Sequence, residues 1–226
     1  MNNVKWMLAM AAIAATTGLT IAPVSLAQPS APTAGALQRI RGFLNGGSPK
    51  RGPGGNGGSR GDAPFCLVNP GQGETLWTEQ PLVMAQGRVV RLDLRLADEP
   101  NALWSTSVIP GDENWVQVAY DGDPLVPGEQ YEWVFYQWRR DRTLGIRQRV
   151  PFQVMAAGDE RDRIAATIEY LQAAPDQSLR LQLDYLLGKQ LAADALQLLF
   201  TAEEPSDTLL EDRQALVAEI CAEPEP

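Results

Sequence analysis

Five arginines and one aspartate fall between residues 139 and 149 of a chain that contains no histidine. Arg139, Arg140 and Arg142 come first, and Arg147 follows them. A guanidinium presents a planar fork of donors that matches carboxylate and phosphate groups. The cluster therefore predicts a binding site for an anionic glycan, a lipid headgroup or an acidic partner. The chain's own acidic helical segment is another candidate partner. A solvated surface loop is the alternative interpretation, because runs of like charge are common on exposed segments.

The composition excludes several classes of enzyme. Without histidine the chain cannot build a Ser-His-Asp triad, a Cys-His pair or a His-ligated metal site. Its two cysteines are too few for a four-thiolate zinc site, and the sequence has neither a phosphate-binding loop nor a nucleophile elbow. Asp121-Gly122-Asp123 is better explained as a turn than as a calcium loop. We therefore predict no catalytic residue, no metal and no cofactor, although a two-carboxylate glycosidase remains open on composition.

The charge of the chain is divided between its two ends. The 226 residues carry a formal net charge of −9, which argues against a nucleic-acid partner. Residues 28–60 contain five basic side chains and no acidic one, whereas residues 158–226 are strongly acidic. Attraction between the basic leader and the acidic body would allow the leader to fold back on the body.

Residues 1–27 have the layout of a secretory signal peptide. Lys5 supplies the positive charge, residues 6–15 form the apolar core, and small residues precede a cut between Ala27 and Gln28. A retained anchor is the alternative, but the apolar core is shorter than the ~20 residues that a membrane span needs. We expect cleavage and a periplasmic or secreted location.

Residues 28–63 are expected to form a disordered leader. Nine glycines lie between residues 42 and 61, and such a composition buries too little apolar surface to offset the entropy of the chain. The leader could contact an anionic membrane or cell wall peripherally. A plain flexible linker is the alternative.

Residues 64–157 carry the period-two pattern of β-strands. Apolar and charged residues alternate in 90–96 and again in 146–154, and the latter places Ile146 on the same apolar face as Val150. Six or seven short runs of this kind, separated by Gly, Pro, Asn and Asp, predict an antiparallel β-sandwich.

One segment of this domain resembles a known strand entry. The stretch LVPGEQYEW at residues 125–133 is similar to the entry to the sixth strand of fibronectin type III and related immunoglobulin-like domains. The resemblance implies that Pro127 and Gly128 form the corner. It also implies that the hydroxyl of Tyr131 bonds to the backbone a few residues upstream. It concerns the fold and not the function.

Five of the six tryptophans lie in the β domain. Packing in or near the core is the main interpretation, because each ring buries a large area. A platform for stacking carbohydrate is the alternative, since strand parity places Trp133 and Trp138 on opposite faces.

Residues 158–221 change to a helical period and predict a small α-helical hairpin or bundle. Four helices are expected, and they start near Asp159, at Asp176 or Ser178, near Leu191 and near Ser206. Residues 187–205 weakly resemble half of a tetratricopeptide hairpin. The helices are expected to pack on each other and on the sandwich, and residues 222–226 to be disordered.

Cys66 opens the β domain and Cys221 closes the last expected helix. In an exported chain an even pair suggests an intramolecular disulfide. Two free thiols or an intermolecular bond are the alternatives.

The whole layout resembles a group of uncharacterised exported proteins best known from cyanobacteria. The residues that carry the resemblance are Cys66, Leu76–Leu82, Leu103-Trp104 and Pro124–Trp133. The group is known only as a domain of unknown function, so it implies no catalytic residue.

The expected fold is α+β, an immunoglobulin-like sandwich followed by helices. The expected function is non-catalytic binding or scaffolding in the cell envelope, with an envelope protein or an anionic polymer as partner. The alternative is a carbohydrate-binding or carbohydrate-acting protein that uses exposed tryptophans and carboxylates.

Overall fold

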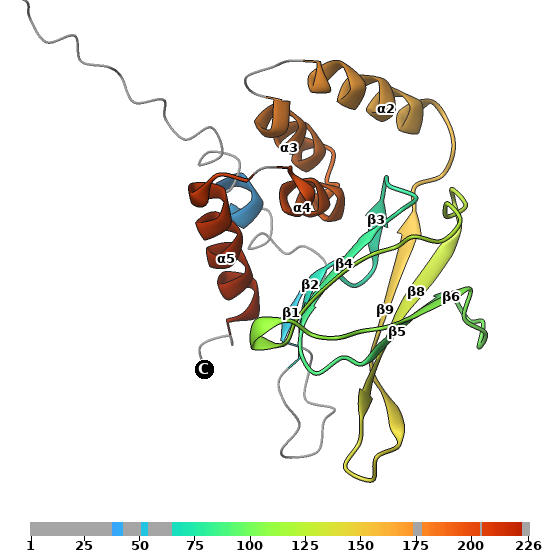
Figure 1. Ribbon diagram of the computed structural model, residues 1–226. Helices are drawn as coiled ribbons and strands as arrows, with labels where there is room; N and C mark the ends of the chain where they lie inside the picture. The colour runs from blue at the N-terminus through green and yellow to red at the C-terminus, as the bar shows by residue number, and fades with distance from the viewer. Residues whose placement is uncertain (1–37, 43–50, 54–64, 174–177, 204, 223–226) are drawn as a thin grey trace, which may run out of the picture. The chain divides into compact units, whose positions relative to one another are not determined.

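The computed structural model describes residues 38–42, 51–53, 65–173, 178–203 and 205–222 (Figure 1). The predicted signal peptide, most of the predicted leader and residues 223–226 lie outside these ranges. The described residues form an α+β arrangement in which two β-sheets are followed by helices. All of them belong to one compact unit that spans residues 31–226.

The strands form a four-stranded and a five-stranded sheet. The first has the order β1 (Gly52–Pro53), β2 (Cys66–Asn69), β4 (Leu82–Gln86) and β7 (Trp115–Ala119). The second has the order β3 (Glu74–Leu76), β9 (Leu144–Val154), β8 (Gln130–Trp138), β5 (Arg91–Leu96) and β6 (Trp104–Ser107). Every pairing is antiparallel except that of β3 with β9, which is parallel.

The two sheets share a core to which each contributes one face of its strands. Leu92 and Leu94 of β5 and Trp133 of β8 are fully buried there, together with Val83 and Ala85 of β4. This burial follows the alternation of apolar side chains along the strands. β4 is apolar on both faces because its other face packs against the helices.

The helices follow the strands in the chain and share a second core with the four-stranded sheet. Their bounds are α2 (Asp159–Gln172), α3 (Ser178–Gly188), α4 (Ala192–Thr201) and α5 (Asp207–Cys221). Leu183, Leu196 and Leu216 are fully buried in this core beside Val68 and Met84 of the sheet. The four expected helices are therefore present with nearly the expected bounds. None of the helices within the described ranges has the length and apolar character that a membrane span requires.

Asp194 connects the helices to the strands. Its carboxylate accepts hydrogen bonds from the backbone N–H groups of Trp77 and Thr78, at 2.9 and 2.7 Å. Burial raises the pKa of Asp194 to about 6, although the two backbone hydrogen bonds lower it. The nearby Glu74 raises it further.

Two pieces of the leader are ordered, which differs from the expected disorder of residues 28–63. Residues 38–42 form a short helix whose Ile40 is fully buried in the helical core. β1 pairs with β2, and at Gly52, with φ of 97°, a Cβ atom would lie 2.8 Å from the carbonyl oxygen of Ile220. Local composition favours disorder there, but burial and strand pairing override it.

Three basic side chains of the leader pair with carboxylates of the body. The pairs are Arg39–Asp184 at 3.1 Å, Arg41–Glu219 at 2.9 Å, and Arg51–Glu74. Arg51 and Glu74 are both almost completely buried. The expected attraction between the basic leader and the acidic body is confirmed at these residues, so their charges are engaged within the protein.

The corner before β8 is held by a side chain. The Val126 N–H donates to the hydroxyl oxygen of Tyr131 at 2.9 Å, and the Tyr131 ring is buried. Gly128 has φ of 93°, a conformation that a residue with a Cβ atom rarely adopts. Its N–H donates to the carbonyl of Val154 at 3.0 Å, which ties the corner to β9.

Candidate functional site

The β8–β9 hairpin extends past the strand beside it. The ladder between β5 and β8 ends at the pair Arg91–Tyr136, whereas β8 and β9 continue to pair as far as Trp138 and Leu144. The end of the hairpin therefore projects from the five-stranded sheet (Figure 1).

A register shift in this hairpin changes the face on which Ile146 lies. Phe135 pairs with Gln148 but Tyr136 pairs with Ile146, so Arg147 is an extra residue in β9. Such a bulge reverses the alternation of side chains on either side of it. The prediction that Ile146 shares the apolar face of Val150 is therefore wrong: Val150 is fully buried, and Ile146 is 43% exposed on the outer face.

The outer face of the hairpin end is apolar. Cross-strand partners point to the same side of a sheet, as do residues two apart along a strand. The pairs Tyr136–Ile146 and Trp138–Leu144 therefore lie next to each other on one face. Trp138 is 62% exposed and Leu144 is 37% exposed. We call these four residues the apolar hairpin face.

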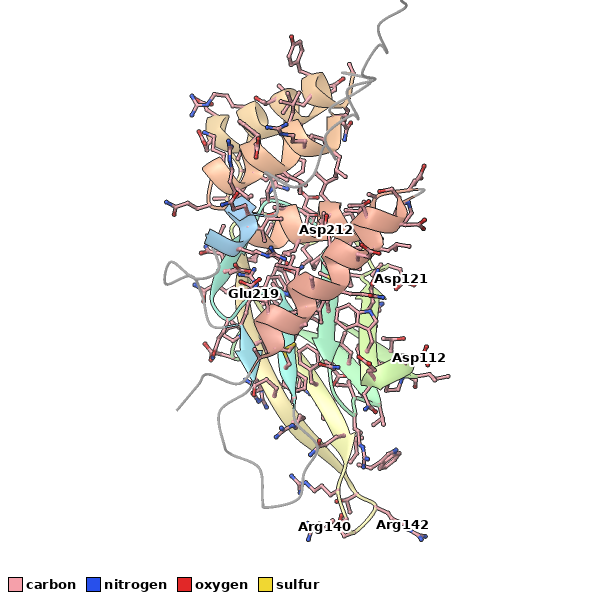
Figure 2. The ribbon with its side chains drawn as sticks, turned by 90° about the vertical axis from the view of Figure 1, so that its left-hand side faces the viewer. Asp112, Asp121, Arg140, Arg142, Asp212 and Glu219 are labelled. Atoms are coloured by element: carbon pink, nitrogen blue, oxygen red, sulfur yellow. A yellow bond between two sulfur atoms is a disulfide. The ribbon has the colours of Figure 1, made fainter. Side chains whose placement is uncertain are left out.

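The turn that closes the hairpin carries three of the four predicted binding arginines. Arg140 and Arg142 are exposed and point away from the strands at the tip (Figure 2). Arg139 is also exposed, but its side chain lies over Gly145, where a Cβ atom would be 2.2 Å from the Arg139 Nε. Gly145 pairs with Gln137, and both residues lie on the face opposite the apolar hairpin face. Arg139 therefore covers that opposite face.

The turn is ordered by its own hydrogen bonds. The Asp141 carboxylate accepts from the N–H of Thr143 at 2.9 Å and from its hydroxyl at 2.6 Å. These bonds lower the pKa of Asp141. The Arg139 N–H donates to the Thr143 carbonyl at 2.8 Å, and the Arg142 N–H donates to the Arg139 carbonyl at 3.0 Å.

Arg147 does not join the other three arginines. It is the bulge residue, it is half-buried, and its guanidinium lies 5.8 Å from the centre of the Phe65 ring. Its place beside a buried ring indicates packing against the edge of the inter-sheet core.

A charged network continues the outer face from the hairpin onto β5. The buried carboxylate of Asp93 accepts from Arg91 Nε at 2.7 Å, from the Ser105 hydroxyl at 2.8 Å and from Arg95 at 3.2 Å. Burial alone would raise the pKa of Asp93, but these hydrogen bonds outweigh it and keep that pKa below its ordinary value.

The same network reaches the apolar hairpin face. The Arg91 guanidinium lies 5.5 Å from the centre of the Tyr136 ring, and Arg95 hydrogen-bonds the Tyr136 hydroxyl. Burial raises the pKa of Tyr136, and the neighbouring Asp93 adds to this rise. Further along the face, Arg149 pairs with Glu132.

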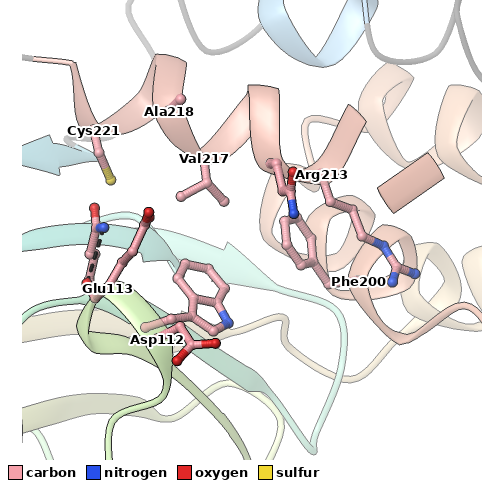
Figure 3. A pocket seen from close by; sticks show the side chains of 10 residues that line it. Asp112, Glu113, Phe200, Arg213, Val217, Ala218 and Cys221 are labelled. Carbon is pink, nitrogen blue, oxygen red and sulfur yellow. Dashed lines mark hydrogen bonds between the residues drawn. The ribbon is translucent and has the colours of Figure 1, made fainter. Parts of the chain in front are cut away.

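A separate groove of about 780 Å³ lies between α5 and the segment formed by β7 and the short 3-10 helix η1 (Asp112–Asn114) (Figure 3). The rings of Trp115 and Phe200 stack in it with centres 6.1 Å apart. Asp112 and Glu113 approach it from the strand side and Val217 from α5.

Arg213 also lines this groove, but its guanidinium donates hydrogen bonds to backbone carbonyls of the protein itself. Its Nε donates to the Leu199 carbonyl at 3.0 Å and its NH2 group donates to the Ala202 carbonyl at 3.3 Å. Its guanidinium lies 5.7 Å from the centre of the Phe200 ring. Burial lowers the pKa of Arg213. The groove is therefore aromatic and acidic rather than cationic.

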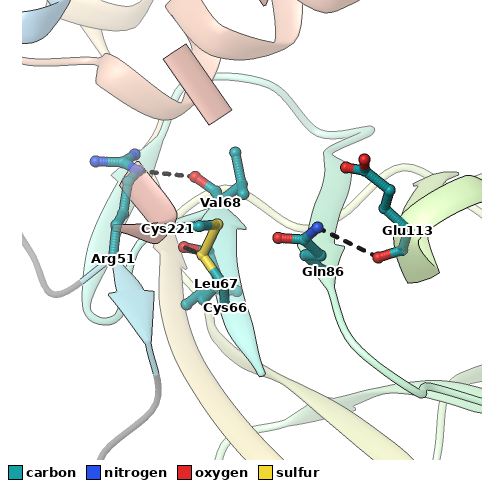
Figure 4. Close-up of a disulfide and its surroundings, with 7 residues drawn as sticks. All are labelled: Arg51, Cys66, Leu67, Val68, Gln86, Glu113 and Cys221. Atoms are coloured by element: carbon teal, nitrogen blue, oxygen red, sulfur yellow. Dashed lines mark hydrogen bonds between the residues drawn. A yellow bond between two sulfur atoms is a disulfide. The ribbon is translucent and has the colours of Figure 1, made fainter. Parts of the chain in front are cut away.

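Cys66 and Cys221 form a disulfide bond at the end of this groove (Figure 4). The two residues are 155 apart in sequence and their Cα atoms lie 5.6 Å apart. The bond fastens the last residue of α5 to β2. Beside it, Arg51 Nε donates to the Val68 carbonyl at 3.0 Å, so a leader segment meets the same junction.

The segment Asp121-Gly122-Asp123 serves as a turn. Asp121 accepts from the indole N–H of Trp104 at 2.8 Å, and the Tyr120 hydroxyl donates to the carbonyl of Asp123 at 2.8 Å. A Cβ atom at Gly122 would meet the Tyr120 side chain at 2.5 Å. Across the described ranges, no cluster of three or more Cys, Asp or Glu side chains is arranged to hold a metal ion.

The sequence predicted a candidate binding site at the arginines, but it did not predict the apolar hairpin face beside them. A bulge sets that face, and no residue type in the sequence marks the bulge. The tryptophans differ in exposure, because Trp133 is fully buried in the core whereas Trp138 is 62% exposed.

Comparisons with known proteins add little to this description. No family model matches the chain, and no curated protein matches it. Among solved structures, the chain is similar to one described as "Structures of Clostridium thermocellum CbhA fibronectin(III)-like modules". That match has 12% sequence identity and a TM-score of 0.25, and it covers 40% of this chain and 92% of the other. The likeness is weak, and the strand order given above rests on the hydrogen-bonded ladders alone.

Proposed function

We propose that the protein is a non-catalytic binding module of the cell envelope that recognises an anionic component through the β8–β9 hairpin. The observation that carries the proposal is the exposure of Arg140 and Arg142 at the tip of an ordered turn. Binding to such a turn costs less conformational entropy than binding to a mobile loop. Asp141, the one acid among the arginines, is already hydrogen-bonded to Thr143.

We also propose that the two sheets form an immunoglobulin-like sandwich. In support, β2, β4 and β7 occupy the places of strands A, B and E, while β5, β8 and β9 occupy those of C, F and G. The bond from Val126 to Tyr131 matches the tyrosine corner of such domains. In this assignment the binding hairpin is the F–G loop, one of the loops that carry the binding site in antibody variable domains.

Export to the envelope is part of the proposal. Its support is the signal-like layout of residues 1–27 together with the Cys66–Cys221 bond, since structural disulfides persist in oxidising compartments.

Retention on immobilised heparin, used as a soluble-polymer model of an anionic ligand, tests the proposal. The variant Arg140→Gln/Arg142→Asn should elute at lower salt than the wild type. The slope of log affinity against log salt should fall by about two, one for each lost contact. Asn is chosen for position 142 because Arg142 has φ of 63°, which Asn tolerates.

The matched control is Arg163→Gln/Arg180→Gln, which removes the same charge from exposed arginines of α2 and α3. It should elute with the wild type. Equal loss of retention in both double variants would mean that net charge, and not the hairpin, governs binding.

Carbohydrate binding in the groove is a second candidate function. The stacked rings of Trp115 and Phe200 beside Asp112 and Glu113 favour it, because a sugar ring offers C–H groups to an aromatic face and hydroxyls to carboxylates. Affinity electrophoresis in a gel that contains a soluble chitin derivative should retard the wild type but not Trp115→Ala. Equal mobility of the two proteins would remove this candidate.

A further inference from the structure

We propose that the β8–β9 hairpin docks on the surface of an anionic lipid bilayer, with the apolar hairpin face at the interface between headgroups and acyl chains. This inference rests on the proposed function, because it names the anionic component. It commits to a membrane rather than a soluble polymer for two independent reasons, one apolar and one electrostatic.

The first reason is the apolar hairpin face itself. Trp138, Leu144 and Ile146 are three of the large apolar side chains that the described residues leave exposed, and they are adjacent in one ladder. A hydrated polyanion such as heparin offers at most the C–H groups of single sugar rings, and not a continuous hydrocarbon surface that would cover all three side chains. The interface of a bilayer offers such a hydrocarbon surface, and the burial of apolar side chains there is favourable. Tryptophan in particular is enriched at that depth.

The second reason is the charge around this face. Arg140 and Arg142 lie in the turn that joins Trp138 to Leu144, and Arg91 lies against Tyr136 at the other end of the apolar hairpin face. The carboxylates on the same face are already matched by arginines: Asp93 bonds to two of them, and Glu132 pairs with Arg149. The outer face is therefore cationic on a chain whose net charge is −9.

This charge distribution fixes the orientation of the protein on the membrane. An anionic bilayer repels an acidic protein except where a local basic surface faces it. The acidic helices pack mainly against β1, β2 and β3, whereas the cationic face belongs to β5, β8 and β9. Docking through the hairpin brings arginine to the lipid phosphates and lets the apolar hairpin face lie on the hydrocarbon boundary, as in other peripheral amphipathic elements.

Flotation with lipid vesicles tests the inference. The vesicles are phosphatidylcholine alone or an equimolar mixture of phosphatidylcholine and phosphatidylglycerol. The first variant, Trp138→Thr/Leu144→Thr, keeps strand-forming residues while it removes the apolar face. Its control, Leu103→Thr/Val126→Thr, removes exposed apolar side chains near Tyr131, at the other end of β8. All proteins begin at Gln28, the start of the expected mature chain, and keep the same residues 28–63, so differences between them report the hairpin and not the N-terminal segment.

The wild type should float with the mixed vesicles and much less with phosphatidylcholine alone. Trp138→Thr/Leu144→Thr should lose at least about tenfold in affinity for the mixed vesicles. Arg140→Gln/Arg142→Asn should lose about thirtyfold, from about 1 kcal/mol per arginine. The Leu103→Thr/Val126→Thr control should match the wild type.

Two results would overturn the inference in distinguishable ways. If the wild type binds heparin but not mixed vesicles, or if the threonine variant floats as well as the wild type, the ligand is a polyanion without an apolar part. The proposed function then stands without the membrane. If the arginine variant matches the wild type on both heparin and vesicles, the proposed function fails as well.

Discussion

Two side chains, Tyr131 and Asp194, connect separate elements of this fold by accepting hydrogen bonds from backbone N–H groups. Tyr131 accepts from the N–H of Val126 at the corner before β8. Asp194 accepts from the N–H groups of Trp77 and Thr78 between β3 and β4. The first bond positions β8, the first strand of the β8–β9 hairpin, and the second fastens the helices to the sheets.

Replacing Tyr131 by Phe should lower the free energy of unfolding by about 1 kcal/mol, because the ring stays buried while the Val126 N–H loses its acceptor. Urea denaturation measures this change. Tyr170→Phe is the control, since Tyr170 is 78% exposed, and it should leave the stability unchanged. Equal stability of Tyr131→Phe and the wild type would show that the corner does not depend on the hydroxyl.

The pH dependence of stability should report Asp194. Its pKa in the folded protein is about 6, above the ordinary 3.8, so the native state holds this proton more tightly than the unfolded chain. The stabilisation that comes from this tighter proton binding is fully present below about pH 4 and is lost as the pH rises through 6. The loss amounts to about 3 kcal/mol, at about 1.4 kcal/mol for each pH unit between the two values.

Urea denaturation at pH 4.5 and pH 7.5 should therefore show a less stable protein at the higher pH. The chain has no histidine to titrate between these values, and the depressed pKa values of Asp93, Asp141 and Glu160 place their effects at lower pH. Asp194→Asn should remove the difference, although one of the two N–H groups then loses its acceptor. A difference of the same size in the variant would assign it to another group.

At the scale of elements, α5 depends on its covalent attachment. It buries Leu209 and Leu216, and it ends at the disulfide to β2. In the chain-entropy model a bridge across 155 residues contributes up to about 5 kcal/mol. Without the bridge, this helix should be the first to separate from the sheet.

The variant Cys66→Ala/Cys221→Ala should be less stable than the wild type by up to about 5 kcal/mol. Native-state hydrogen exchange should show the largest loss of protection in α5 and a smaller loss in β5 and β8. Reduction of the wild type should reproduce the behaviour of the variant. Uniform loss of protection across the protein would contradict a separate opening of α5.

The elements differ in how far the sequence predicts them. The helices were predictable because their apolar residues recur with a 3.6-residue period, and β5 because its apolar and charged residues alternate. β1 was not, since a Gly-Pro pair in a glycine-rich segment has no strand pattern and becomes ordered only by pairing with β2. The bulge at Arg147 was not predictable either, and it places Ile146 on the apolar hairpin face instead of in the core.

At the scale of the molecule, charge is sorted between the basic leader, the acidic helices and the outer face of β5, β8 and β9. Basic side chains of the leader are paired with acidic groups of the body, so the leader adds less free positive charge than its composition suggests. The outer face of β5, β8 and β9 keeps a positive excess. The sequence alone indicated that the arginines of the hairpin, which supply part of this excess, form a candidate binding surface. It could not show that they border an apolar surface, because that depends on strand pairing across the hairpin.

Mapping of backbone amide chemical shifts during titration with heparin tests the central claim most directly. If the hairpin is the binding element, the shift changes should centre on residues 136–146 and extend to 91–95 of β5. They should disappear in Arg140→Gln/Arg142→Asn and persist in Arg163→Gln/Arg180→Gln. Shift changes centred on α5 and η1, or none at saturating heparin, would contradict the claim.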